Sequence, residues 1–208
     1  MIRSTDQMAE QKKRSTMTVS LSKGQTVSLK KESGGTLTHV RMGLGWDAVK
    51  KKGFFGGSKS QSIDLDASAV LYDAGGAVLD QVWFRQLKSK DGSVQHTGDN
   101  RTGAGEGDDE SIVVYLDRLH PDVATIVFLV NSFTGQDFSQ IENAFCRLVD
   151  ETNGQEIARY ELSSMGNHTA QVMAKVARDG AGWSMTAIGA TAHGRTFKDL
   201  LPAVQPHV

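Results

Sequence analysis

The segment with the strongest chemical character is an acidic, glycine-rich stretch, HTGDNRTGAGEGDDE, which runs from His96 to Glu110. Between residues 99 and 110 it holds five carboxylates and one arginine, a charge of −4 (−5 + 1), and its only apolar side chain is Ala104. Such a stretch cannot order itself by burying apolar surface, and its like charges repel one another. Either it stays solvated or a cation organises it.

Carboxylate oxygens on a flexible glycine backbone suit Ca²⁺, which takes about six to eight oxygen ligands in tolerant geometry. Mg²⁺ demands a stricter octahedron, and zinc or copper would call for histidine or cysteine groupings that the stretch lacks. Asp99 and Glu110 stand at positions 1 and 12 of an EF-hand loop, but Ala104 replaces the glycine required at position 6. Any calcium site here is therefore of another type, and a solvated acidic loop without an ion is the alternative.

A second pair of acids, Asp64 and Asp66, flanks Leu65 at the start of an expected strand. In an extended backbone, residues i and i+2 point to one face, so the two carboxylates converge while Leu65 faces the core. Asp47 ends the preceding strand and is a candidate to join them. The alternative is that Asp64 and Asp66 cap loops or pair with lysines of residues 50–59.

Patterns typical of enzymes are weak in this sequence. The string GFFGGSKS (53–60) has a serine where a phosphate-binding loop needs its second glycine, and no apolar strand precedes it. No Gly-x-Ser-x-Gly nucleophile motif is present. A single cysteine, Cys146, excludes an intramolecular disulfide framework, and we expect its thiol to be buried and inert. We expect His96, beside the acidic residues, to lie on the surface. We therefore expect a protein that is not an enzyme.

Charge and hydropathy exclude further classes. Lys and Arg number 23 against 24 Asp and Glu, so the net charge of −1 gives no polybasic footprint for nucleic acid or an anionic membrane. The longest apolar run, residues 123–130, is too short to span a bilayer, and residues 1–16 contain no apolar segment of a secretory signal. We expect a cytoplasmic protein without direct membrane insertion, in which a disordered extension over 1–16 precedes one domain over 17–208.

The elements that must position these residues are short strands. Alternating or β-branched runs predict strands at 19–21, 27–29, 36–46, 63–72, 78–87, 112–116, 125–130, 143–150, 155–162, 169–178 and 183–188. Asn153–Gly154 and Asp179–Gly180 predict hairpin turns, and the first two runs suggest an opening hairpin. Residues 50–62 are interpreted as an irregular insertion, and 197–204 as a short C-terminal helix. The fold expected is all-β, a two-sheet β-sandwich of about ten short strands.

Several strings together resemble the tellurium-resistance TerD/TerZ stress-protein family. They are GLGWD (43–47), DLDAS (64–68), KSKDGSVQHTGDNRTGAGEGDDE (88–110), VNSFTGQDF (130–138), ENAFCRLVDE (142–151) and ARYEL (158–162). The resemblance spans residues 17–202. The GFFGGSKS insertion, the VWFRQL run (82–87) and the GRTFKDLLP ending (194–202) resemble the TerZ branch more than TerD itself.

The resemblance implies a β-sandwich that binds two calcium ions without known enzymatic activity. It also implies a role in tellurite and general stress resistance, beside other resistance and stress proteins, some of them membrane-bound. Carried over by position, the metal ligands fall on Asp64, Asp66, Asp99, Asn100, Glu106, Asp108, Asp109 and Glu110. We expect Ca²⁺ to order the acidic stretch into a partner-binding surface. The alternatives are a calcium-dependent carbohydrate- or nucleotide-binding module and an enzyme that modifies an oxyanion such as tellurite.

Overall fold

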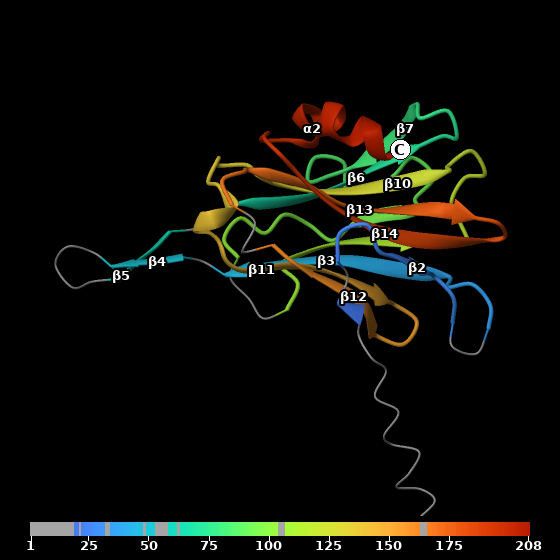
Figure 1. Ribbon diagram of the computed structural model, residues 1–208, viewed down its shortest axis with the longest axis horizontal. Coiled ribbons are helices and arrows are strands. Elements are labelled where there is room, and N and C mark those ends of the chain that lie inside the picture. The colour runs from blue at the N-terminus through green and yellow to red at the C-terminus, as the bar shows by residue number, and fades with distance from the viewer. Residues whose placement is uncertain are drawn as a thin grey trace, which may run out of the picture.

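Two β-sheets stacked face to face form the body of the described chain (Figure 1). The computed structural model describes residues 19–20, 22–31, 34–47, 49–52, 58–61, 63–103, 107–162 and 166–208. The expected extension over 1–16 and the predicted ligand Glu106 lie outside these residues. The predicted all-β sandwich with a short C-terminal helix is confirmed.

The first sheet carries the strand that leads out of the acidic stretch. Its neighbouring strands, in spatial order, are β1 (Val19–Ser20), β12 (Gln155–Glu161), β11 (Glu142–Asp150), β3 (His39–Asp47), β9 (Glu110–Tyr115) and β8 (Val94–His96). Its pairings are antiparallel except that of β1 with β12, which is parallel. The acidic stretch therefore connects β8 and β9, two neighbouring strands at one edge of this sheet.

The second sheet carries the Asp64–Asp66 segment. Its order is β2 (Thr26–Ser28), β14 (Gly182–Ala192), β13 (Ala170–Asp179), β10 (Thr125–Ser132), β6 (Leu65–Tyr72) and β7 (Val78–Val82). All of its pairings are antiparallel. In the first sheet, a four-residue turn over 151–154, which contains the predicted Asn153–Gly154 pair, closes the β11–β12 hairpin, with Gly154 at φ +73°.

The central strand β10 is apolar on both faces because both are covered. Ile126, Phe128 and Val130 lie in the core between the sheets, whereas Val127 and Leu129 lie under helix α2 (Phe197–Val204). The helix begins with a capping box between Thr196 and Asp199, and it buries Phe197, Leu200 and Val204 at helical spacing against the sheet. Short 3₁₀ turns stand at 138–140 and 205–207.

A separate two-stranded hairpin projects from one end of the sandwich (Figure 1). Its strands are β4 (Val49–Lys52) and β5 (Ser58–Gln61), and it joins the end of β3 in one sheet to the start of β6 in the other. The prediction of an irregular insertion over 50–62 is wrong for the described residues of both strands. An isolated hairpin has no buried face to give an apolar pattern, so sequence periodicity does not reveal it.

Two more local predictions are wrong. The first two strands do not form a hairpin, because β1 pairs with β12 in one sheet and β2 pairs with β14 in the other. Alternation alone predicts a strand and not its partner.

The strand expected to reach Leu87 ends at Val82, where a tight turn from Trp83 to Gln86 follows. The strand prediction over 169–178 is confirmed by β13.

No helix among the described residues is long and apolar enough to cross a membrane.

Candidate metal centre

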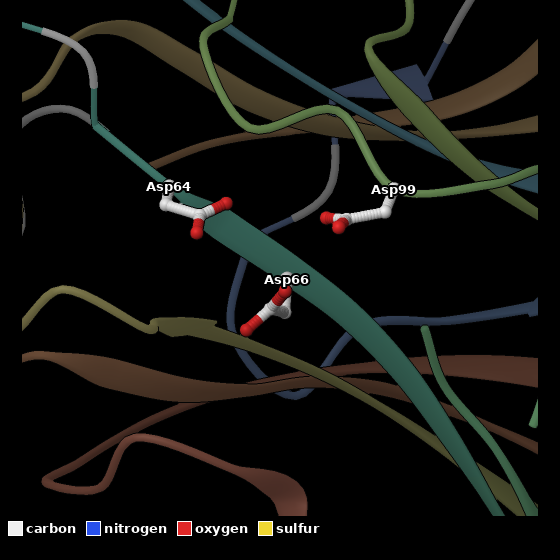
Figure 2. A group of neighbouring side chains, drawn as sticks. All are labelled: Asp64, Asp66 and Asp99. Carbon is white, nitrogen blue, oxygen red and sulfur yellow. The ribbon is translucent and has the colours of Figure 1, made fainter. Parts of the chain in front are cut away.

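An acidic cluster forms where the start of β6 meets the segment that follows β8. Asp64 immediately precedes β6, Asp66 is the second residue of β6, and Asp99 lies between β8 and β9. One carboxylate oxygen from each lies within 4.8 Å of the others. Figure 2 shows the Asp99 side chain pointing from its own segment toward Asp64 and Asp66. "Acidic cluster" below means these three residues.

The spacing in the acidic cluster fits a shared hard cation. Two oxygens that each lie about 2.3–2.6 Å from one Ca²⁺ can be up to roughly 5 Å apart. The cluster supplies oxygen donors alone, which suits Ca²⁺ better than zinc or copper. In the described structure, Asp64 Oδ1 is buried without a hydrogen-bond partner, so one potential ligand atom is unsatisfied.

Electrostatics show that the cluster is short of positive charge. Burial first, and then the neighbouring Glu110 and Asp64 carboxylates, raise the pKa of Asp66 to about 8. The pKa of Asp64 is also raised, first by burial and then by Asp99, while the nearby Arg101 acts in the opposite direction. A carboxylate with a raised pKa is one whose ionised form lacks compensation, which a bound cation would supply.

Glu110 lies beside the acidic cluster, and its hydrogen bonds connect the acidic stretch to β6 of the second sheet. Its side chain is fully buried; Oε2 accepts a hydrogen bond from the Ala67 backbone N at 2.8 Å, and Oε1 accepts one from the Asn100 backbone N at 3.0 Å. His96 Nε2 lies 3.4 Å from Glu110 Oε2, and both side chains are inaccessible to solvent. The surface position expected for His96 is therefore wrong: the ring packs inward from β8.

Asn131, which is not among the predicted ligands, contacts Asp66 from the neighbouring strand. The two residues are paired in the β6–β10 register, and Asn131 Nδ2 donates to Asp66 Oδ2 at 3.0 Å. The same amide nitrogen donates to the Arg195 carbonyl at 2.7 Å, just before α2. Asn131 is completely buried, and its Oδ1 has no partner among the described residues. An asparagine that follows the apolar 123–130 run was the signal available in the sequence.

Asn100 and Asp109 brace the acidic stretch internally. Asn100 Nδ2 donates to Asp109 Oδ1 at 2.7 Å, and the Asn100 side-chain oxygen accepts from the backbone nitrogens of Thr102 and Gly103. Asp109 Oδ2 accepts from the Trp46 backbone N at 2.9 Å. Burial raises the pKa of Asp109 even though this backbone hydrogen bond lowers it. Both residues belong to the acidic stretch, and their side chains form hydrogen bonds that shape it.

Asp108 has a different environment. It forms ion pairs with Arg41 on β3 and with Arg147 on β11, the latter at 2.6 Å between Arg147 Nε and Asp108 Oδ1. The two arginines lie on the outer face of the first sheet, since their strand neighbours face the core. A Cβ at Gly43 would overlap the Asp108 carboxylate, so glycine at this position makes room for it. Asp108 is thus held by arginines and is not part of the acidic cluster.

The eight predicted ligands accordingly fall into distinct groups. Asp64, Asp66 and Asp99 are brought together; Glu110 lies next to them; Asn100 and Asp109 shape the loop; Asp108 is paired with arginines; and Glu106 lies outside the described residues. Whether each binds a metal stays a prediction.

Comparison with known proteins identifies relatives along most of the chain. A family model described as the TerD domain matches residues 17–202. The chain is 52% identical to tellurium resistance protein TerZ of Serratia marcescens over 184 residues, which covers 88% of this chain and 94% of that protein. It is 38% identical to stress response protein SCP2 of Bacillus subtilis over 197 residues, covering 89% of this chain and 98% of that one.

A solved structure shows the same fold. The crystal structure of a homologue of telluride resistance protein (TerD) from Streptomyces coelicolor A3(2) superimposes with a TM-score of 0.66, covering 79% of this chain and 95% of that one, at 22% sequence identity. Because the family model matches far more than half of the sequence and the relatives align over nearly their whole length, the chain belongs to the TerD family of tellurium-resistance and stress-response proteins.

Proposed function

We propose that this chain is a calcium-binding protein that acts in tellurite and stress resistance without catalysing a reaction. The observation that supports it most is the acidic cluster, in which three carboxylates from two chain segments converge and one of them, Asp66, is buried. Asp64, Asp66 and Asp99 would hold the ion, which would supply the positive charge that the raised pKa values of Asp64 and Asp66 indicate is missing. A second ion would draw on Asn100, Glu106, Asp109 and Glu110.

The proposed consequence of calcium binding is that the acidic stretch becomes fixed to the second sheet. Asp99 belongs to the stretch, while Asp64 and Asp66 belong to the second sheet, so a cation shared among them would fix one to the other. The ordered stretch would then present a defined surface to a partner, for which we propose other tellurium-resistance or stress proteins. The names of the relatives refer to resistance and stress response, which agrees with this role.

The alternative functions have less support. Cys146 is buried and its pKa is raised to about 12 by desolvation, so its thiol is poorly suited to reduce or bind an oxyanion. A described cavity of about 250 Å³ is lined by residues that include Lys90, Asp91 and His120, and none of its lining residues belongs to the acidic cluster. A calcium-dependent small-molecule site at that cavity therefore lacks a link to the metal centre.

Isothermal calorimetry of the chelator-treated protein titrated with calcium tests the proposal. We expect saturable binding in the wild type and loss of the site formed by the acidic cluster in Asp66→Asn, which keeps the shape of the side chain and removes its charge. Asp117→Asn is the matched control, because Asp117 is exposed and its side chain forms no described ion pair. Equal titrations of wild type and Asp66→Asn would reject the proposed site.

A second experiment connects the site to resistance. Cells that lack this gene would be complemented with the wild type, Asp66→Asn or Asp117→Asn and grown on tellurite. We expect Asp66→Asn to fail while the control restores growth at equal protein level. Full complementation by a variant shown to have lost calcium binding would separate resistance from the metal.

A further inference from the structure

A turn with exposed aromatic and cationic side chains lies at the same end of the sandwich as the acidic cluster. The turn follows β7 and is closed by reciprocal backbone hydrogen bonds between Trp83 and Gln86, so Phe84 and Arg85 occupy its tip. Trp83 and Phe84 are half-buried, Arg85 is exposed, and Leu87 is 43% exposed. The residues from Trp83 to Leu87 are called the aromatic turn below.

The rings of the aromatic turn belong to a chain of edge-to-face contacts. Trp83 contacts Phe197 of α2 with ring centroids 5.1 Å apart, and Phe84 contacts Phe133 at 5.7 Å. Phe133 in turn donates its backbone N–H to the Asp64 carbonyl at 2.9 Å. The aromatic turn is therefore connected by direct contacts to the metal centre, through the segment that follows β10.

Two cations that form no ion pair among the described residues lie over these rings. The Arg85 guanidinium lies 5.6 Å from the Trp83 ring centroid and 5.3 Å from that of Phe84, and Lys198 Nζ lies 5.8 Å from the Trp83 ring. Both cations are exposed, and no ion pair joins either of them to a carboxylate in the described chain. Aromatic rings with unpaired cations at the solvent boundary are a combination suited to the headgroup region of a membrane.

The β4–β5 hairpin adds positive charge at this end. Its strands carry four lysines and no acid, and the register places Lys51 opposite Lys59. It extends beyond the ends of both sheets and forms no ladder with either of them (Figure 1). Like charges opposite one another destabilise a ladder, and an isolated hairpin is marginal in water, so an anionic partner would stabilise this one.

We propose that this end of the protein docks on anionic phospholipid surfaces through the aromatic turn and the β4–β5 hairpin. The charge of the lysines and arginine complements that of acidic headgroups, and the exposed Leu87, beside the half-buried Phe84, supplies apolar surface for contact with them. The acidic cluster next to Phe133 repels the same headgroups while its charge is uncompensated. Calcium at the cluster would remove that repulsion, and this dependence on calcium rests on the proposed function.

A membrane fits these features better than a soluble polyanion. Nucleic-acid bases stack on open aromatic faces, but the Trp83 and Phe84 rings are already engaged by one another, by Phe197 and Phe133, and by Arg85 and Lys198. An acidic peptide binds in a groove, whereas the hairpin projects from the body of the protein (Figure 1).

Vesicle flotation of the full chain tests the inference. The vesicles contain either phosphatidylcholine alone or phosphatidylcholine with phosphatidylglycerol, at physiological ionic strength, with calcium or with EGTA. We expect binding to the anionic vesicles, stronger in calcium, and little binding to phosphatidylcholine alone. Lys51→Glu with Lys59→Glu, and separately Phe84→Ser with Arg85→Glu, should each lower the affinity at least about tenfold, since each cation near the surface contributes to attraction.

The control variant is Lys30→Glu with Lys31→Glu. It changes the charge as much as the hairpin variant does, but these exposed lysines precede β3, at the end of that strand opposite to the hairpin. A thermal melt of each variant confirms that it folds. We expect the control to bind anionic vesicles as the wild type does, because its substitutions lie away from the docking surface.

The outcomes separate this inference from the proposed function. A normal response to calcium in calorimetry without any vesicle binding would overturn the docking surface and leave calcium binding intact. Vesicle binding that both test variants retain, or heparin binding as tight as vesicle binding and equally sensitive to the variants, would also overturn it. Variant-sensitive vesicle binding in a protein that takes up no calcium would support the docking surface and reject the proposed function.

Discussion

At the scale of single residues, the carboxylates of the acidic stretch have unequal roles. Asp99 joins Asp64 and Asp66, whereas Asp108 is clamped between Arg41 and Arg147. These two ion pairs fix the acidic stretch at Asp108 to the first sheet, and they do so without a bound cation. The arginines therefore offset charge repulsion around Asp108, and the proposed ion would offset it around Asp99.

The first prediction separates these two roles. Asp108→Ala should lower the free energy of unfolding by about 1–3 kcal/mol, because it leaves two partly buried guanidinium groups without their shared partner. It should leave the stabilisation by calcium unchanged, since Asp108 is outside the acidic cluster. Urea denaturation with calcium and with EGTA measures both quantities. Asp117→Ala, an exposed control, should change stability by less than about 0.5 kcal/mol. Loss of the calcium response in Asp108→Ala would place the site elsewhere.

The second prediction concerns pH. The pKa of Asp66, about 8 in the folded protein, lies above its value of about 3.9 in an unfolded chain, so the folded state binds the extra proton between these limits. Protonation of Asp66 therefore stabilises the folded state, and this stabilisation is fully present below about pH 4 and is lost as pH rises through about 8. The raised pKa values of Asp64 and Asp109 act in the same direction.

Urea midpoints of the chelated protein, measured across this range for the wild type and for Asp66→Asn, check the pH prediction. We expect wild-type stability to fall relative to the variant as pH rises, because asparagine does not titrate. Calcium binding should strengthen over the same range, as the proton competes with the ion. Parallel curves for the two proteins would show that Asp66 ionises normally in the folded state.

At the scale of elements, the site depends on where neighbouring strands end. β7 pairs with β6 from Ala69 to Tyr72 and does not extend to Ala67. The Ala67 backbone N instead donates to Glu110 at the start of β9, in the other sheet. One buried carboxylate thus completes the edge of β6 and fixes the acidic stretch through Asn100.

The third prediction follows from this arrangement. Glu110→Ala leaves two backbone N–H groups without their acceptor and should lower the free energy of unfolding by about 2–4 kcal/mol. Glu110→Gln keeps one acceptor oxygen and should lose less. Amide hydrogen exchange should show faster exchange at Ala67 and Asn100 in the alanine variant, ahead of the rest of β6. Unchanged protection at both amides would contradict the role given to Glu110.

The same scale explains what the sequence could predict. The strands, the hairpins at Asn153–Gly154 and Asp179–Gly180 and the C-terminal helix were predictable because periodicity and turn chemistry are local. Which strands pair with one another was not predictable. For example, β1 and β2 belong to different sheets although they are close in the sequence. Nearness of Asp64 to Asp66 follows from strand geometry, but the positions of Asp108 and Asn131 depend on register across strands far apart in the chain.

At the scale of the whole molecule, the acidic cluster draws its residues from both sheets. Asp64 and Asp66 belong to the second sheet, and Asp99 belongs to the connection between two strands of the first. A ligand that binds the folded state alone stabilises it by RT ln(1 + [L]/Kd), about 2.7 kcal/mol at a hundredfold excess over Kd. Because the ion would bridge both sheets, the stabilisation should appear in the unfolding of the entire domain and not in one loop.

The central claim is tested most directly by differential scanning calorimetry of the wild type and of Asp64→Asn with Asp66→Asn, each in calcium and in EGTA. A domain of this size gains roughly 2–4 °C in Tm per kcal/mol. We predict that calcium raises the wild-type Tm by about 5–10 °C in a single transition, and that the double variant does not respond. A wild-type shift below about 1 °C, or an equal shift in the double variant, would contradict the account.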